Sequence, residues 1–291
     1  MPLRKLLKKA GNYFSFYPIT VVLFLASPFS IHFVEKLAGV IGFIAFYIAY
    51  PRSRIAMKNL DTAYGDRLSC REKRAIAISS AQNLVKTAFE LHYFYVRGMG
   101  EVKRKISFEG LDNYKQALKK GPVLFISGHV GNFPIMGSAF SSEGFTINVI
   151  AKAISSKGIE KLLNVYRKKL KQPVIYYHPR FMALKKAIKS LRTGCAVFIY
   201  VDQRFSHGIK TTFFGKNVLT ATGANALAKK TGASVLPAFI SRNGTRHIIH
   251  IGKAIAVNGS EEENTQLFTS AVEEAVRKSP GQWFWFHRRW R

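Results

Sequence analysis

The chain has 291 residues, of which 47% are hydrophobic, so a packed core is expected and a largely disordered chain is excluded. Lysine and arginine number 45 against 16 acidic residues, and the net charge of +29 indicates a negatively charged partner, such as an anionic lipid, a nucleic acid or an acidic carrier protein. The basic residues are spread along the whole sequence without a zinc-finger or basic-zipper pattern, so no nucleic-acid partner is predicted. The cysteines, Cys70 and Cys195, form no C-x-x-C pair, which favours a reducing compartment.

Residues 1–52 are predicted to form a hydrophobic helical segment that anchors the chain to a membrane. After Lys9, no formally charged residue occurs until Glu35, and a second uncharged run extends over residues 37–50. The first run is longer than the roughly 20 residues that cross a hydrocarbon core, but prolines interrupt it. Basic residues flank both runs, so the positive-inside rule favours a re-entrant hairpin with both ends on the cytoplasmic side. Burial of both runs in a soluble core is the alternative.

Residues 53–100 are predicted to form a helical approach region. Apolar residues recur at helical spacing from Ala75 to Phe89. Ser69, followed three residues later by Glu72, has the pattern of a capping box at a helix start.

Residues 101–291 are predicted to form one α/β catalytic domain with a central mixed sheet flanked by helices. Short apolar runs alternate there with charged amphipathic stretches, which is typical of a sheet covered by helices. Strands are expected over residues 123–127, 146–151, 174–177, 196–201, 234–240 and 247–251. Helices are expected over residues 111–119, 158–170, 181–191, 223–230 and 261–278.

The segment Gly128-His129-Val130-Gly131-Asn132 directly follows the first of these strands, and Pro134 stands where a helix could begin. Ligands of open α/β sheets bind at the carboxyl edge of the strands. An imidazole there could take the proton from a hydroxyl that attacks a thioester, and the backbone N–H groups of Gly131 and Asn132 could hold the developing oxyanion. The alternative is a turn histidine whose glycines serve only the chain geometry.

Further sequence blocks accompany this segment in order from about residue 50 onward. They are residues 54–60 (RIAMKNL), 201–203 (VDQ), 213–215 (FFG), 222–228 (TGANALA), 229–233 (KKTGA) and 282–290 (QWFWFHRRW). Together with residues 127–133, these blocks resemble the bacterial lipid A (late) acyltransferase family of the lysophospholipid acyltransferase-like superfamily, which also includes phosphatidylinositol mannoside acyltransferases.

The resemblance implies a glycerolipid acyltransferase-like fold and a membrane-associated enzyme on the cytoplasmic face of the inner membrane. Such an enzyme moves a fatty acyl group from acyl carrier protein or coenzyme A to a hydroxyl of a lipid A-type or other glycolipid or phospholipid acceptor. His129 would be its general base. The thioester is a co-substrate, and no cofactor is implied. The acyl length, the acceptor, the choice of donor and the oligomeric state stay open.

One departure concerns the acid that supports the histidine. The family has H-x-x-x-x-D/E, but Pro134 stands at the acid's position and can neither orient nor charge-stabilise an imidazole. Asp202 follows a predicted apolar strand, so we expect it on the same rim as His129 and within hydrogen-bonding reach. An ion pair with Arg204 is the alternative role of Asp202, and Glu143 is the second candidate acid.

Lys152, Arg167 and Arg204 are the candidate substrate-binding residues, because both predicted substrates carry negative charge. Lys152 stands where the family commonly has an arginine after its second strand. A solvated surface charge is the alternative for each. No metal site is predicted, since the histidines lack H-E-x-x-H or other ligand spacing and thioester chemistry needs no metal.

The aromatic and basic residues of segment 283–290 suit either a lipid headgroup zone or the protein core. Without a G-x-S-x-G motif, direct attack by the acceptor is expected rather than an acyl-serine intermediate. Two other functions fit the sequence: a non-catalytic basic protein that binds membrane surfaces, and a hydrolase of acyl thioesters.

Overall fold

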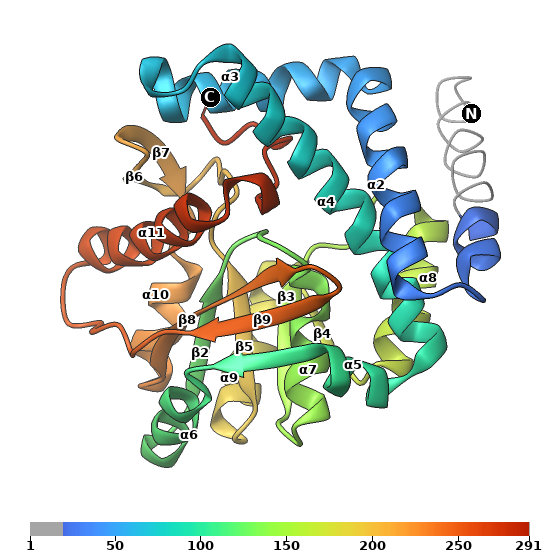
Figure 1. Cartoon of the computed structure of the whole chain (residues 1–291). Coiled ribbons are helices and arrows are strands. Elements are labelled where there is room, and N and C mark those ends of the chain that lie inside the picture. The colour runs from blue at the N-terminus through green and yellow to red at the C-terminus, as the bar shows by residue number, and fades with distance from the viewer. Residues whose placement is uncertain (1–19, 291) are drawn as a thin grey trace, which may run out of the picture.

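The computed structural model describes residues 20–290, in which seven strands form one mixed sheet (Figure 1). Across the sheet the strands are β1 (Ile106–Glu109), β9 (Arg246–Ile251), β8 (Ser234–Asn243), β2 (Val123–Ser127), β5 (Ala196–Tyr200), β3 (Ile147–Ala151) and β4 (Val174–Tyr176). The five strands from β8 to β4 run parallel, whereas β9 is antiparallel to β8 and β1 is parallel to β9. The predicted mixed sheet is confirmed.

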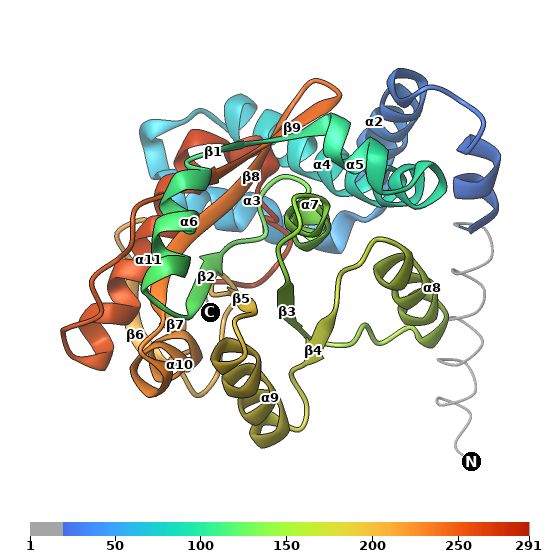
Figure 2. The same cartoon turned by 90° about the horizontal axis from the view of Figure 1, so that it is seen from below.

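Helices cover both faces of this sheet. The named helices are α2 (Ile31–Ile48), α3 (Tyr50–Tyr64), α4 (Cys70–Arg97), α5 (Met99–Lys105), α6 (Leu111–Lys120), α7 (Met136–Ser142), α8 (Lys157–Lys169), α9 (Arg180–Arg192), α10 (Gly223–Thr231) and α11 (Glu261–Lys278), with short 3-10 turns η1 (Gly65–Arg67), η2 (Phe133–Ile135) and η3 (Pro280–Gln282). Helices α2 and α3 pack on α4. Seen along the strands, α7 and α8 lie on one side of β3 and β4 and α9 on the other (Figure 2). The helical region 53–100 contains most of α3, then η1, α4 and the start of α5, and the predicted capping box opens α4.

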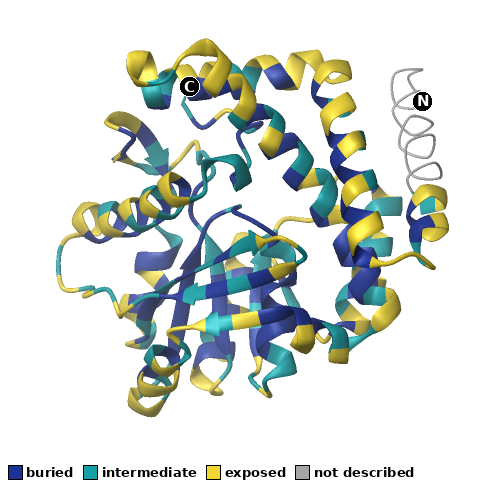
Figure 3. Ribbon diagram, viewed as in Figure 1, coloured by how far each residue is buried: buried dark blue, intermediate teal, exposed yellow. Residues whose placement is uncertain are grey.

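Strand β2 lies at the centre of the core and is buried along its whole length. Leu124 and Ile126 belong to the cluster beneath α9, α10 and α11, whereas Val123 and Phe125 face the cluster that includes α6 and α7. Alternate side chains of the strand therefore enter opposite layers, and Figure 3 shows the buried strands between exposed helix faces. A parallel strand covered on both faces reads as a continuous apolar run, which is why its position was predictable.

Three strands were not predicted. β1 has only four residues, and β6 (Ile209–Phe213) pairs with β7 (Lys216–Thr220) as a separate antiparallel hairpin. The inner side chains of this hairpin alternate with exposed polar ones, so its sequence lacks the long apolar run that marks the central strands. All the other predicted strands and helices of the domain are present, with ends shifted by a few residues.

The amino-terminal helix α2 differs from the predicted division into two uncharged runs. It begins at Ile31 and continues through the charged residues Glu35 and Lys36. The side chain of Glu35 is buried against the body of the protein. Gly42 permits the close crossing of α2 over α4, since a Cβ atom there would lie 2.5 Å from the Gln82 Cα atom. The first uncharged run is helical over residues 20–26, and its earlier part lies outside the described residues.

Helix α2 is long and apolar enough to cross a membrane by length and composition, with a mean hydropathy of 1.6. One side of the helix packs on α4, and its other side exposes Phe43, Ile44 and Ile48. Phe24 and Leu25 of the preceding helical turn are also exposed, at 73% and 64%. The amino-terminal region thus presents a large apolar surface to its surroundings.

Candidate active site

His129 and Asp202 follow neighbouring parallel strands at the same edge of the sheet. β2 pairs with β5 so that Ser127 lies opposite Tyr200, and each chain leaves its strand within the next two residues. The backbone N–H of Val201 donates to the Ser127 carbonyl over 3.1 Å and extends this pairing to the strand ends. The sheet register therefore places the two side chains together.

The Asp202 carboxylate binds His129 at two points. Oδ1 lies 2.7 Å from His129 Nδ1, and Oδ2 accepts the backbone N–H of His129, also over 2.7 Å. The predicted contact is present. The described structure gives Asp202 no ion pair with Arg204, and Glu143, the second candidate acid, instead pairs with Lys103 at the end of α7, 3.5 Å away. Both alternatives are therefore wrong.

Asp202 is ionised at neutral pH. Its side chain is almost wholly buried, which by itself would raise the pKa, but the His129 charge and hydrogen bonds from His129 and Trp283 lower the pKa to about 2. A carboxylate 2.7 Å from Nδ1 requires that this nitrogen carry the hydrogen. The other ring nitrogen, Nε2, then has a free lone pair and can act as a base.

The His129 ring is held at the rim of the site with its side chain 19% exposed. The ring centroid lies 4.5 Å from that of Phe133 and 5.0 Å from that of Tyr200. The Tyr200 hydroxyl donates to the Phe133 carbonyl over 3.1 Å, so the two aromatic walls are tied to each other. A narrow pocket beside the ring is lined by His129, Phe133 and other residues, including Leu84, Thr87 and Phe284.

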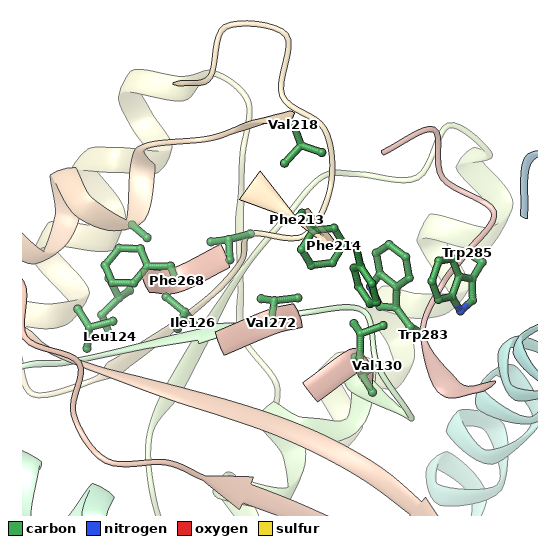
Figure 4. Packing of buried hydrophobic residues seen from close by; sticks show 14 of the residues in the cluster. Leu124, Ile126, Val130, Phe213, Phe214, Val218, Phe268, Val272, Trp283 and Trp285 are labelled. Carbon is green, nitrogen blue, oxygen red and sulfur yellow. The ribbon is translucent and has the colours of Figure 1, made fainter. Parts of the chain in front are cut away.

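The carboxy-terminal segment 283–290 holds the acid in place. The indole N–H of Trp283 donates to Asp202 Oδ2 over 2.8 Å. The Ser80 hydroxyl donates to the Trp283 carbonyl, and the Asn59 amide donates to two further backbone carbonyls of this segment. Figure 4 shows Trp283 and Trp285 packed among buried residues from β2, the β6–β7 hairpin and α11. Only 2% of Trp283 is exposed and none of Trp285, so core packing is correct for them and the lipid-headgroup alternative is wrong.

Gly131 does not supply the expected oxyanion donor. Its N–H already donates to the Gln282 carbonyl over 3.0 Å. Its φ is +59°, and a Cβ atom would lie 2.2 Å from the Ile240 carbonyl oxygen, so glycine is required for close packing on β8. The prediction for the Gly131 N–H is therefore wrong, for a structural reason.

Asn132 is fully buried, and its side chain joins a charged network. Its Nδ2 donates to Glu90 Oε2 over 2.7 Å, and the same carboxylate forms a close ion pair with Arg242 and lies 3.2 Å from His247 Nε2. Arg242 also donates to Asn83, whose amide donates to the Gly131 carbonyl over 3.2 Å. The described side chain of Asn132 thus anchors the His129 loop to α4 and β8, while the role of its backbone N–H stays a prediction.

The three predicted substrate-binding cations have different surroundings. Lys152 is exposed directly after β3, at the strand edge that also bears His129. Arg204 is half-buried two residues after Asp202, and its Nε has no hydrogen-bond partner among the described residues. Arg167 is paired with Glu160 over 2.7 Å and lines a separate open pocket beside β4, so its surroundings do not support a role next to His129.

Residues 20–290 contain no group of three or more His, Cys, Asp or Glu side chains that could hold a metal ion. Two site residues escaped sequence reasoning although both lie in blocks that the resemblance had marked. Gln203 lies 3.3 Å from His129 Nε2, and Trp283 binds the acid. The available signal for Gln203 was its position directly after Asp202, at a strand end.

These features define an α/β protein with a histidine–aspartate pair at the carboxyl edge of a largely parallel sheet. The chain matches, over residues 3–291, the family described as bacterial lipid A biosynthesis acyltransferase. It belongs to this family, and it is an acyltransferase of the lipid A and glycerolipid type.

The chain is similar to a lipid A biosynthesis acyltransferase of Haemophilus influenzae. The two are 20% identical over 256 residues, which cover 86% of this chain and 79% of the relative. Among solved structures, the chain resembles the 1-acyl-sn-glycerophosphate acyltransferase PlsC of Thermotoga maritima with a TM-score of 0.40 and 18% identity, over 86% of this chain and 99% of that one.

Proposed function

We propose that this protein moves a fatty acyl group from an acyl thioester to a hydroxyl of a lipid A-type glycolipid, with His129 as general base and Asp202 as its supporting acid. The single observation that carries the proposal is the orientation of His129. Asp202 holds Nδ1 at 2.7 Å, so the lone pair of Nε2 is left for an incoming hydroxyl. The family and the named relative supply the class of acceptor.

The reaction needs no covalent enzyme intermediate. The acceptor hydroxyl donates a hydrogen bond to His129 Nε2, and its oxygen attacks the thioester carbonyl carbon. The O–H proton moves to Nε2 as the new C–O bond forms. The C–S bond then breaks, and the leaving thiolate takes the proton from the imidazolium and departs as the thiol. Asp202 stays ionised throughout and stabilises the imidazolium.

Membrane association at the cytoplasmic face of the inner membrane is part of the proposal. The exposed apolar side chains of α2 and of residues 20–29 support it, because an apolar surface of this extent is unfavourable in water. One side of α2 is packed on α4, which favours insertion of the other side into one leaflet over a crossing. The net charge of +29 adds attraction to anionic lipid.

The donor is proposed to be acyl carrier protein or coenzyme A. Both are anionic, and the exposed Lys152 and the unpaired Nε of Arg204 lie on or near the rim that bears His129. These two cations are the proposed contacts for the phosphate of either donor or of the acceptor. Parallel assays with the two donors decide between them.

The test uses the purified full-length protein in vesicles that contain under-acylated lipid A, with radiolabelled palmitoyl-coenzyme A or palmitoyl-acyl carrier protein. We expect His129→Ala and Asp202→Asn each to lower transfer by about 10²- to 10⁴-fold. Glu143→Gln is the control, since its carboxylate pairs with Lys103, and it should keep wild-type transfer.

Undiminished transfer by His129→Ala would remove the proposed base. Release of free palmitate at the same rate without lipid acceptor would show a thioester hydrolase instead. Vesicle binding by the wild type with no acyl turnover from either donor would favour the non-catalytic membrane binder.

A further inference from the structure

Gln203 lies beside the one ring nitrogen of His129 that Asp202 leaves free. Its side-chain Nε2 is 3.3 Å from His129 Nε2. No other described side chain hydrogen-bonds to this nitrogen. A residue at this place stands next to the atoms that react in the proposed transfer.

The chemistry of the pair fixes which end of the Gln203 amide faces the ring. Because Nδ1 carries the hydrogen that is bonded to Asp202, Nε2 is an acceptor and needs a donor opposite it. Only the NH₂ group of the amide can donate, whereas its oxygen would face a lone pair. In the resting protein, therefore, the Gln203 amide covers the lone pair of the base.

The backbone of Gln203 is fixed while its side chain is partly exposed. Arg289, of which only 1% is exposed, donates to the Gln203 carbonyl over 2.9 Å. The same guanidinium also donates to the Leu219 carbonyl and to Thr220 Oγ1, at 3.0 and 2.7 Å. The amide can therefore turn away from Nε2 without moving the chain that carries it.

Of the two backbone donors predicted for the oxyanion, the Gly131 N–H is bonded to Gln282, which leaves the Asn132 N–H and a place for a second donor. When the acceptor hydroxyl at His129 Nε2 attacks, its oxygen becomes bonded to the thioester carbon. The oxyanion on that carbon is then two bonds from the hydroxyl oxygen. That hydroxyl would displace the Gln203 amide from its place 3.3 Å from Nε2, so the amide would stand next to the oxyanion. An amide donor next to a developing negative charge stabilises the transition state more than the bound substrate.

We propose that Gln203 is a catalytic residue, whose amide caps His129 Nε2 in the free protein and donates to the thioester oxyanion during transfer. This inference rests on the proposed acyl transfer. No bond to Gln203 forms or breaks, and its amide only shifts its hydrogen bond from the imidazole to the oxyanion. Arg289 is the positioning residue that holds its backbone.

The test compares Gln203→Met and Gln203→Ala with Gln116→Ala in the vesicle assay. Methionine keeps much of the length and volume of glutamine and has no donor, and Gln116 is an exposed glutamine on α6. Loss of one oxyanion donor lowers kcat by about 10²- to 10³-fold, so both Gln203 variants should show that loss with KM for the donor changed less than about threefold. The melting temperature of both should equal that of the wild type, and Gln116→Ala should match the wild type throughout.

A kcat within tenfold of wild type for Gln203→Met, measured while His129→Ala is inactive, would overturn the role of Gln203 and leave the proposed function intact. A rise in KM with kcat unchanged would likewise overturn it, because that pattern reports substrate binding alone. If His129→Ala also retained wild-type transfer, the proposed function itself would fail.

Discussion

Trp283 donates its indole N–H to Asp202 over 2.8 Å, so the acid that orients His129 is itself oriented from the carboxy-terminal segment. The bond reaches across 81 residues of sequence. Together with the backbone N–H of His129, it fixes Oδ2 and leaves Oδ1 for the imidazole. The orientation of the proposed base therefore depends on a tryptophan whose indole nitrogen binds the acid and not the imidazole.

Replacement of Trp283 by phenylalanine is expected to lower acyl transfer by about tenfold or more. The side chain stays aromatic, although smaller, but the Asp202 carboxylate loses a charge-assisted bond, and such bonds contribute about 1.5–3 kcal/mol to stability. Trp285→Phe is the matched control, because Trp285 is equally buried and its N–H donates over 2.8 Å to a neutral carbonyl, that of Pro280. An equal loss of activity in both variants would assign the effect to packing rather than to the Asp202 bond.

The ionisation of Asp202 makes stability depend on pH in the acid range. Its pKa is about 2 in the folded protein, below the ordinary value of 3.8, so the unfolded chain binds its proton first as the pH falls. The stabilisation is therefore complete above about pH 4 and lost toward pH 2, and a shift of this size corresponds to about 2 kcal/mol. Denaturant unfolding at pH 7 and pH 3 should show a smaller decrease for Asp202→Asn than for the wild type. An identical decrease would contradict this account.

The buried pair of Glu90 and Arg242 should be important for both stability and activity. Removal of one partner of a buried ion pair leaves an uncompensated charge and costs about 3–5 kcal/mol, so Glu90→Gln should lower the melting temperature strongly. Because Glu90 also anchors Asn132 over 2.7 Å, transfer at a permissive temperature should fall as well. Glu274→Gln, which removes an exposed pair with Lys278, should leave both unchanged. Wild-type stability of Glu90→Gln would show that the pair contributes little.

The apolar side of α2 should carry membrane binding. Phe43 and Ile44 are 45% and 48% exposed, and burial of each such side chain is worth about 1.5–3 kcal/mol, so Phe43→Ser with Ile44→Ser should weaken sedimentation with anionic vesicles by more than tenfold. Leu267→Ser on α11 is the control, since Leu267 is 46% exposed on another element. Equal binding by all three proteins would place the membrane contact elsewhere.

Sequence reasoning reached the features that local patterns encode. The central strands appear as apolar runs because both of their faces are covered, and the start of α4 follows from the Ser69–Glu72 pair. The contact of His129 with Asp202 was predictable because both residues follow buried strands, and parallel neighbours end at one edge.

Contacts between distant segments could not be predicted in this way. Trp283 fits a membrane-facing position and a core position equally well until its partner Asp202 is known. The need for glycine at position 131 is visible only from the close approach of the Ile240 carbonyl. The hairpin of β6 and β7 was missed because polar residues alternate along it. Each of these features depends on tertiary packing rather than on a periodic pattern.

The dependence of the site on residues 283–289 has a consequence for the order of events during synthesis. A ribosome that has added Asp202 and Gln203 must still add more than 80 residues before Trp283 and Arg289 exist to hold them. At about 5–20 residues per second, that interval is roughly 4–16 s. The hydrophobic helix α2 has been made long before, so a nascent chain that binds the bilayer through α2 does so before the His129–Asp202 pair is supported. The segment proposed to bind the membrane is thus synthesised before the residues that hold the proposed catalytic pair.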